Sequence, residues 1–431
     1  MKADLAFGRR GISLNLPEGY RYEVLEARSA RPLGDVRAEL DQALDHPIGR
    51  PSLEEMARGK RSAAISVCDI TRPAPNSITL PPLLDRLHRG GIAEEEITIL
   101  VATGLHRQAT NEELRTILGP EIAGRYRTIS HDARALSEHR SLGKTRRGTT
   151  VLIDERFMAA GLHITLGFIE QHLMLGFSGG RKLIAPGLAA QETIKVLHSP
   201  RFMREEAAVE GSIDENPLHD ELLEIAQMAR HDFMLDVALT HSREIAGVFA
   251  GDGVRAHAAG VEFVRQSQLI PMEQYADAVI TSGAGYPLDS TFYQTVKGVT
   301  AAQHIVKPGG RILILGECSE GVGGPEFAAQ LKGFRNYAAY LEQIASAPVE
   351  VDQWQLEKLA LAGLRFDVLF FAPGVTSTAM GRLAEKHFSQ IDAALAAFFQ
   401  GLPRQARIAV VPAGPYAFAR VVQRALSGSQ G

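Results

Sequence analysis

One segment in the middle of the chain combines a histidine, a glycine-rich turn and a lysine. In chain order its key residues are His172, Gly176, Gly179, Gly180 and Lys182. Glycines adopt positive φ angles without a steric penalty, so backbone N–H groups can approach an anion closely. Such a turn at a helix start favours phosphate. The lysine adds a point charge, or a nucleophilic amine if its pKa is lowered.

The spacing of this turn differs from that of two common nucleotide-binding motifs. Leu183 occupies the position where a phosphate-binding loop needs a hydroxyl, and the G-x-G opening of the dinucleotide fingerprint is missing. A glycine-rich turn with one lysine is by itself more often an ordinary loop. His172 lies ten positions before Lys182 and His198 lies sixteen after it. The two histidines favour a ligand site.

Polar residues also follow two predicted strands. The apolar run 63–67 leads into Asp69-Ile70-Thr71-Arg72, which two prolines constrain, and the run 97–102 leads into a loop that contains His106. In open α/β sheets the carboxyl ends of strands carry the ligand. Asp69 and Arg72 could form a simple capped turn with a surface ion pair. Alternatively they form a clamp for a carboxylate or phosphate, for which the planar guanidinium is suited.

A further polar pair lies in the second half of the chain. After the predicted strand 276–281, a helix opens with Tyr293-Gln294-Thr-Val-Lys297. Because Gln294 and Lys297 are three positions apart, they share one face of that helix.

Composition limits the classes of protein that the chain can belong to. The 431 residues are 45% hydrophobic, carry a net charge of −4 and include only two cysteines, so the chain fits neither a nucleic-acid scaffold nor a disulfide framework. The first residues have no apolar signal core, and no run approaches the roughly 18 apolar residues of a membrane span. We expect a soluble cytoplasmic protein that binds neither nucleic acid nor membrane.

Strand and helix patterns alternate along the chain, which indicates an α/β fold with largely parallel sheets. We predict two α/β domains with the active site in the cleft between them. The first comprises residues 1–270 and would bind a cofactor. The second comprises residues 271–412 and would close over a substrate, while residues 413–431 could pack back on the first domain.

Several reactive residue types are better explained by structural roles. Cys68 is expected to be a small buried hydrophobe at a strand end. His131 and Asp132 are expected to form a strand-end turn. The remaining histidines in this group are predicted to be core, helix or surface residues: His88, His163, His219 and His304.

Taken together, the motifs resemble those of the nickel-pincer lactate racemase family. The resemblance runs from about residue 7 to Trp354. The segments that carry it are Asp69-Ile-Thr-Arg72-Pro, Thr103-Gly-Leu-His106-Arg, His172 with Gly176-Phe-Ser-Gly-Gly-Arg-Lys182, His198, and Tyr293-Gln-Thr-Val-Lys297.

The resemblance implies a cofactor and a set of site residues. The cofactor would be a nickel-pincer nucleotide, a pyridinium-3-thioamide-5-thiocarboxylate mononucleotide with Ni(II), attached covalently to Lys182 with His198 as the nickel ligand. The residues expected to hold it are Asp69, Ile70, Thr71, Arg72, Gly176, Ser178, Gly179 and Gly180. His106 and His172 would be the acid/base pair. The residues expected to bind substrate are Arg72, Tyr293, Gln294, Lys297 and Trp354.

The reaction that the resemblance implies is racemisation or epimerisation of a small 2-hydroxy acid such as lactate, by hydride transfer to and from the cofactor. Two histidines with pKa values near neutrality suit a reversible reaction on two faces of one carbon. Enzymes that make the cofactor would be its partners in maturation. Two alternatives are a mononucleotide-dependent phosphotransferase or sugar-phosphate enzyme, and a non-catalytic binder of the nickel-pincer cofactor.

Overall fold

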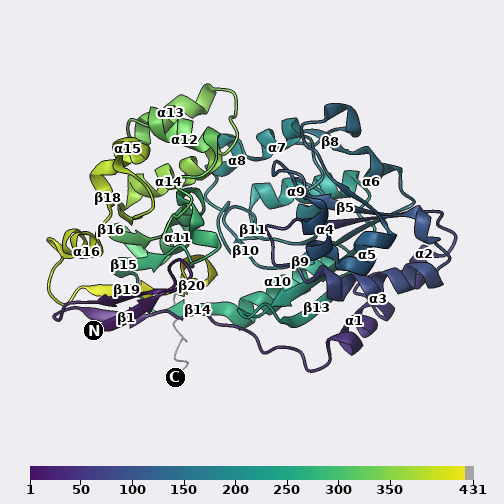
Figure 1. Cartoon of the computed structure of the whole chain (residues 1–431), viewed down its shortest axis with the longest axis horizontal. Coiled ribbons are helices and arrows are strands. Elements are labelled where there is room, and N and C mark those ends of the chain that lie inside the picture. The colour runs from purple at the N-terminus through teal and green to yellow at the C-terminus, as the bar shows by residue number, and fades with distance from the viewer. Residues whose placement is uncertain (423–431) are drawn as a thin grey trace, which may run out of the picture. The chain divides into compact units, whose positions relative to one another are not determined.

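The computed structural model describes residues 1–422, and the chain divides into two compact units. The larger unit comprises Ser29–His198 and Glu205–Ser267. The smaller unit comprises Met1–Arg28, Ser199–Arg204 and the chain from Gln268 onward. Both units are α/β (Figure 1), which confirms the predicted fold class.

The larger unit is built on a six-stranded sheet of order β13-β12-β9-β4-β5-β6. All its neighbours are parallel except β12 and β13, which are antiparallel. Its strands are β4 (Ala63–Cys68), β5 (Ile97–Ala102), β6 (Arg127–Ser130), β9 (Leu162–Phe168), β12 (Phe233–Leu239) and β13 (Ile245–Gly251), with hairpins β7 (His139–Lys144)–β8 (Thr150–Asp154) and β10 (Gln171–His172)–β11 (Gly176–Phe177). Every residue of β4 and β9 is buried, as expected for central parallel strands.

Helices accompany this sheet. They are α1 (Val36–Asp45), α2 (Leu53–Ala57), α3 (Asn76–Arg89), α4 (Asn111–Leu118), α5 (Pro120–Arg125), α6 (Glu155–Ala159), α7 (Gln191–Leu197), α9 (Pro217–Met228) and α10 (Arg255–Gln268). Side chains such as Leu44 of α1 and Leu83 of α3 share one core with Ile65 and Ile164 of the sheet. Several helices start at capping residues. Thr110 and Glu113, for example, form a capping box at α4.

The smaller unit has its own six-stranded parallel sheet, of order β18-β17-β16-β15-β19-β3. Its strands are β3 (Arg21–Val24), β15 (Ala276–Ser282), β16 (Val306–Leu315), β17 (Asp367–Phe371), β18 (His387–Phe388) and β19 (Arg407–Val411), with the pairs β1 (Lys2–Leu5)–β2 (Ile12–Asn15) and β14 (Leu269–Met272)–β20 (Phe418–Val421). Its helices are α8 (Pro200–Met203), α11 (Phe292–Ala302), α12 (Pro325–Gly333), α13 (Tyr337–Ser346), α14 (Gln353–Arg365), α15 (Ser377–Met380) and α16 (Ile391–Phe399).

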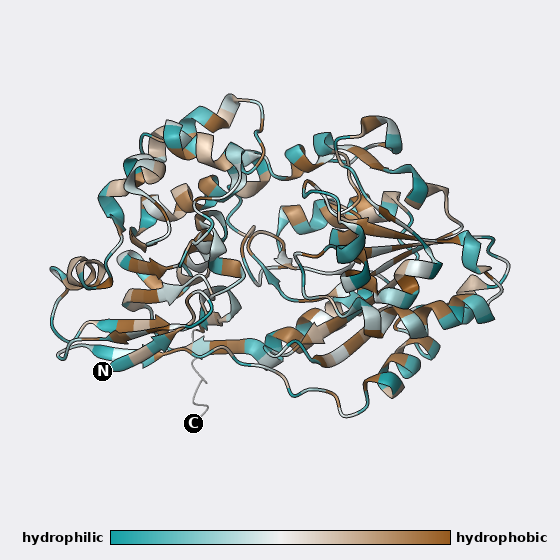
Figure 2. Ribbon diagram, viewed as in Figure 1, coloured by the Kyte–Doolittle hydropathy of each residue, from teal (hydrophilic) through white to brown (hydrophobic). Residues whose placement is uncertain are grey.

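Hydrophobic residues lie along the central strands of both sheets, and hydrophilic residues dominate the outer helix faces (Figure 2). Each unit therefore has a core of its own. Over residues 1–422, no helix is both long enough and apolar enough to cross a membrane.

The predicted domain boundary near residue 270 coincides with the start of the last segment of the smaller unit, but the assignment of residues 1–270 to one domain is wrong. Residues 1–28 belong to the smaller unit because β3 pairs with β19, with Tyr22 opposite Ile408. Residues 199–204 also belong there, since Lys358 on α14 donates to the Met203 carbonyl at 2.7 Å. The described part of the tail pairs with β14 and so lies in the smaller unit. Residues 423–431 lie outside the described residues.

Candidate active site

The loop after β4 brings Asp69 and His106 together. Asp69 Oδ2 lies 2.6 Å from His106 Nδ1, and Asp69 Oδ1 accepts the Thr71 hydroxyl at 2.7 Å. The Asp69 side chain is 7% exposed and that of His106 is 49% exposed, so the fold fixes the carboxylate while the imidazole reaches outward. Burial acts to raise the pKa of Asp69, but the hydrogen bond and charge of His106 outweigh it and the pKa falls below its usual range. Asp69 is therefore an ionised acceptor.

The other residues of this loop lie beside the pair. Ile70 is 37% exposed, and Thr71 is exposed as well. Arg72 is half-buried; its guanidinium donates to the Thr71 carbonyl at 3.3 Å, and its charge contributes to the lowered pKa of Asp69. Of the two groups in the predicted clamp, the Asp69 carboxylate is thus already bound within the protein, by His106 and Thr71.

His172 lies in the hairpin of β10 and β11. Its Nδ1 accepts the Leu175 N–H at 3.3 Å, and Gly176 is paired with it across the hairpin. Gly176 has φ +76°, and a Cβ atom there would lie 1.9 Å from the Ser212 carbonyl oxygen. Only glycine fits this position, so the close approach of residue 212 fixes the hairpin that carries the histidine.

The glycine turn that follows, at Gly179 and Gly180, is in contact with Asp236 on β12. Gly179 has φ +91°, and a Cβ atom there would lie 2.3 Å from Asp236 Oδ2. The same carboxyl oxygen accepts the Gly180 N–H at 2.7 Å. Burial raises the pKa of Asp236 to about 7. Because the Gly180 N–H is used here and the Lys182 N–H donates to the Gly179 carbonyl, the protein itself occupies two of the donors that were expected to hold phosphate.

Arg181 and Lys182 have different environments despite being neighbours. Arg181 is fully buried and donates to the Phe177 carbonyl at 3.0 Å, while its Nη1 atom and the Ser178 carbonyl each lie 2.7 Å from His257 Nε2. Burial, together with the charge of Arg181, lowers the pKa of His257 well below its usual value, which leaves the ring neutral. The Lys182 side chain is half-buried. The turn is thus braced internally by an arginine and presents a lysine.

The Ser178 hydroxyl belongs to the same bracing. It donates to the Phe168 carbonyl at 2.9 Å and accepts the Glu170 N–H at 3.0 Å, so its only proton is used within the fold.

His198 ends α7 and lies close enough to Lys182 for their charges to interact. Its Nδ1 donates to the Ile194 carbonyl at 2.8 Å, which leaves the lone pair of the neutral ring on Nε2. Burial is the main reason that its pKa falls to about 4. The hydrogen bond to Ile194 opposes the shift, and the charge of Lys182 adds to it. The residue as a whole is half-buried. A neutral imidazole with its lone pair on Nε2 is the form that binds a metal.

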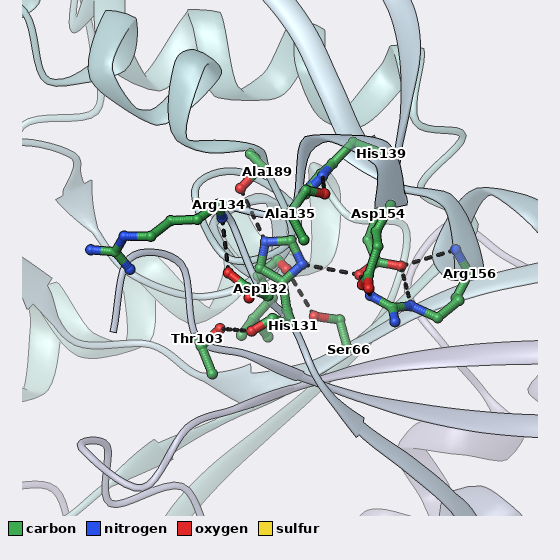
Figure 3. Close-up of polar contacts among 12 residues, drawn as sticks. Ser66, Thr103, His131, Asp132, Arg134, Ala135, His139, Asp154, Arg156 and Ala189 are labelled. Carbon is green, nitrogen blue, oxygen red and sulfur yellow. Dashed lines mark hydrogen bonds and ion pairs between the residues drawn. The ribbon is translucent and has the colours of Figure 1, made fainter. Parts of the chain in front are cut away.

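A buried charge network supports the loop between Lys182 and His198 (Figure 3). His131 Nδ1 lies 3.0 Å from Asp154 Oδ2, and its Nε2 lies 3.1 Å from the Ala189 carbonyl. Arg156 binds Asp154 through two donors, at 2.8 and 2.6 Å. Asp154 and His131 are completely buried. The prediction of a simple strand-end turn missed this role, which depends on residues far apart in the chain.

We expect Asp154→Ala to lower the free energy of unfolding by about 3–5 kcal/mol, because Arg156 and His131 would lose their buried carboxylate. Urea unfolding at pH 7 measures the effect. The hydrogen bonds of Arg156 and His131 hold the pKa of Asp154 below its usual value against burial. The stabilisation is therefore present above the unfolded pKa of about 3.9 and is lost as the pH falls through the folded pKa. An equal loss of stability at every pH would contradict the assignment.

The predicted substrate residues all lie in the smaller unit, apart from Arg72. Tyr293, Gln294 and Lys297 are on α11, which begins where the Thr291 hydroxyl accepts the Gln294 N–H. Trp354 on α14 is 7% exposed and donates from Nε1 to the Tyr293 hydroxyl at 3.1 Å. Trp354 and Tyr293 are therefore in direct contact. Gln294 and Lys297 lie on the same helix as Tyr293.

The Gln294 side-chain oxygen is buried and accepts no hydrogen bond from the described residues. A buried acceptor of this kind is costly unless a partner binds it.

A cavity of about 800 Å³ in the larger unit has none of the predicted site residues in its lining. Arg181 is among the residues that line it. Two of its arginines are neutralised, since Arg146 pairs with Glu224 and Arg50 with Asp252, each at 3.0 Å. The chemistry of this cavity does not match that of the histidine and lysine cluster.

Comparison with known proteins agrees with the motifs. Family models described as the lactate racemase N-terminal domain and the lactate racemase C-terminal domain match residues 7–211 and 272–417. A lactate racemase from Thermoanaerobacterium thermosaccharolyticum is 34% identical over 83% of this chain and 84% of its own length. A lactate racemase from Lactiplantibacillus plantarum is 33% identical over 95% of this chain and 98% of its own length.

Solved structures show the same fold. The lactate racemase apoprotein from T. thermosaccharolyticum superposes with a TM-score of 0.89 at 30% identity, over 97% of this chain and 100% of that one. A Thermotoga maritima protein matches with a TM-score of 0.63 at 17% identity, over 86% of this chain and 97% of that one, which is a likeness of fold alone.

These likenesses define an isomerase of the racemase class. The chain belongs to the lactate racemase family, as its motifs predicted.

Proposed function

We propose that this protein interconverts the two enantiomers of lactate or of a closely related 2-hydroxy acid, with a nickel-pincer nucleotide attached to Lys182 and nickel bound by His198. The observation that carries the proposal concerns the His198 ring. The ring is neutral, has its lone pair on Nε2 and lies close enough to Lys182 for their charges to interact. A metal ligand and a tethering amine would therefore lie close to one another. Both named relatives that match most of the chain are lactate racemases.

The residues around Lys182 fit such a group. Among residues 1–422 no cluster of three or more histidine, cysteine, aspartate or glutamate side chains could hold a metal, so nickel at His198 would take its other ligands from the cofactor. Gly179 has no side chain, and a Cβ atom there would collide with Asp236. The Gly179 carbonyl accepts the Lys182 N–H, so the backbone of the turn lies against Lys182. When bound, the nickel-pincer nucleotide supplies a reversible hydride acceptor.

The chain's own residues would bind the substrate and move its protons. His106 and His172 serve as the acid/base pair for the substrate hydroxyl, because each ring is fixed through Nδ1 and can act through Nε2. Arg72 and Lys297 would bind the carboxylate by charge. Gln294 supplies an amide for the hydroxyl or carboxylate, and its unpartnered oxygen is consistent with a ligand donor.

The phosphotransferase alternative loses its main support, because the N–H groups of Gly180 and Lys182 are used within the protein. The alternative of a non-catalytic cofactor binder does not explain why Gln294 and Lys297 lie together on α11.

Peptide mass spectrometry tests the tether. In protein produced together with nickel and the enzymes that make the cofactor, the peptide containing Lys182 is expected to carry the mass of the pincer nucleotide. Lys182→Arg keeps the positive charge but cannot form the thioamide, so it should lack the adduct and racemisation should fall to background. Lys195→Arg on the nearby helix α7 is the matched control and should keep both. An unmodified Lys182 in active protein would overturn the proposal.

A further inference from the structure

The two predicted acid/base histidines receive opposite hydrogen-bonding partners at the same ring atom. His106 Nδ1 faces the Asp69 carboxylate at 2.6 Å. His172 Nδ1 faces the Leu175 N–H at 3.3 Å. A neutral imidazole has one nitrogen that donates and one that accepts, and the partner at one nitrogen decides the state of the other.

On the His106 side, the partner can only accept. Asp69 is 7% exposed, and its lowered pKa keeps it ionised, so it has no proton to donate. His106 therefore carries its proton on Nδ1. The lone pair of the neutral ring lies on Nε2, at the end of a side chain that is 49% exposed.

On the His172 side, the partner can only donate. The Leu175 N–H is a backbone group in a tight hairpin, where Gly176 at φ +76° is packed against the Ser212 carbonyl. Nδ1 of His172 must therefore supply the lone pair, and the neutral ring carries its proton on Nε2.

We propose that Asp69 and the Leu175 amide hold the two histidines in opposite neutral tautomers, with Asp69 acting as the positioning residue that makes His106 the resting proton acceptor. His172 is then the resting donor. The roles rest on the proposed function, whereas the tautomers do not. In the step assigned to His106, the substrate O–H bond breaks, its proton moves to Nε2, and its electron pair stays on the oxygen. Asp69 then faces the resulting imidazolium and compensates its charge.

Thr71 makes Asp69→Asn a sharp test of this assignment. The Thr71 hydroxyl donates to Asp69 Oδ1. In the variant, the amide oxygen is needed at that position to accept the same hydrogen bond, which turns the amide NH₂ towards His106 Nδ1. The donor would force the His106 proton to Nε2 and remove the acceptor lone pair. Thr71→Val, which keeps the carboxylate, is the matched control and should keep the wild-type tautomer.

The measurement is two-bond ¹H–¹⁵N correlation NMR on cofactor-free full-length protein labelled at histidine, at about pH 8.5, where histidine is neutral. His106→Gln and His172→Gln assign the two rings by loss of their signals. We expect the Nδ1–H form for His106 and the Nε2–H form for His172, with His106 changing form in Asp69→Asn. An Nε2–H form for wild-type His106, or fast averaging of both forms, would overturn the proposal.

The loaded enzyme provides a second readout. Measured on the fraction of protein that carries the Lys182 adduct, Asp69→Asn should lower kcat/KM by about 10²-fold or more and alter its pH profile. A normal kcat/KM in a variant whose tautomer has changed would also overturn the role of Asp69. The NMR result needs neither nickel nor turnover. A missing adduct with the expected tautomers would therefore refute only the proposed function.

Discussion

Replacing His106 or His172 with asparagine is expected to lower the rate of racemisation by about 10²–10⁴-fold in each variant, because each loss removes one proton-transfer group. Lys182 lies outside both hydrogen-bonded pairs, so the cofactor adduct should still form. A chiral assay that follows both enantiomers, together with the mass of the peptide containing Lys182, separates the loss of proton transfer from the loss of cofactor.

The matched control is His46→Asn, because His46 is an exposed histidine at the end of α1 and takes no part in the predicted site. It should leave both the rate and the adduct unchanged. Full activity in either site variant would remove that histidine from the acid/base pair. A variant without the adduct would instead assign that histidine to cofactor binding.

The second large effect is expected from Gly176→Ala. The new Cβ atom would lie 1.9 Å from the carbonyl oxygen of Ser212, and the residue would have to keep φ +76°. A backbone oxygen cannot rotate away as a side chain can, and Asn216 also holds this carbonyl at 3.0 Å. We expect the free energy of unfolding to fall by about 3 kcal/mol or more, from left-handed strain and from the displaced backbone.

Gly148→Ala separates these two contributions. Gly148 has φ +84°, and a Cβ atom added there would have no described neighbour within 4 Å. It should therefore show only the strain of about 1–2 kcal/mol. Chemical denaturation of both variants measures the difference. Equal losses would mean that residue 212 yields readily and does not fix the hairpin of His172.

The sequence predicted the class of fold and the polar ends of individual strands, because both depend on local patterns. Cys68 is buried and has no disulfide, as expected. Asp69 and His106 were each identified at a strand end, but their contact was not predicted. It arises because β4 and β5 are parallel neighbours, so that their carboxyl ends meet at one edge of the sheet.

The residues that brace the glycine turn could not be found in the same way. Asp236 is the single charged residue in the buried strand β12, and that isolated charge was the only signal available. Its function depends on β12 lying beside β9, with Asp236 opposite Gly167. Arg181 next to Lys182 gave no sign that it is fully buried, since its acceptors are carbonyls.

The position of β3 at the edge of the smaller sheet has a consequence for synthesis of the chain on the ribosome. Arg407 binds Glu23 across a separation of 384 positions, and among the described strands of that sheet β3 pairs with β19 alone. All strands of the larger sheet have been synthesised once residue 251 has been added. The larger unit can therefore fold while the nascent chain is still growing. Strand β3 must remain unpaired until β19 has been made, and an unpaired strand edge invites association with other chains. The charged residues of β3, Arg21 and Glu23, oppose such association until β19 has been synthesised.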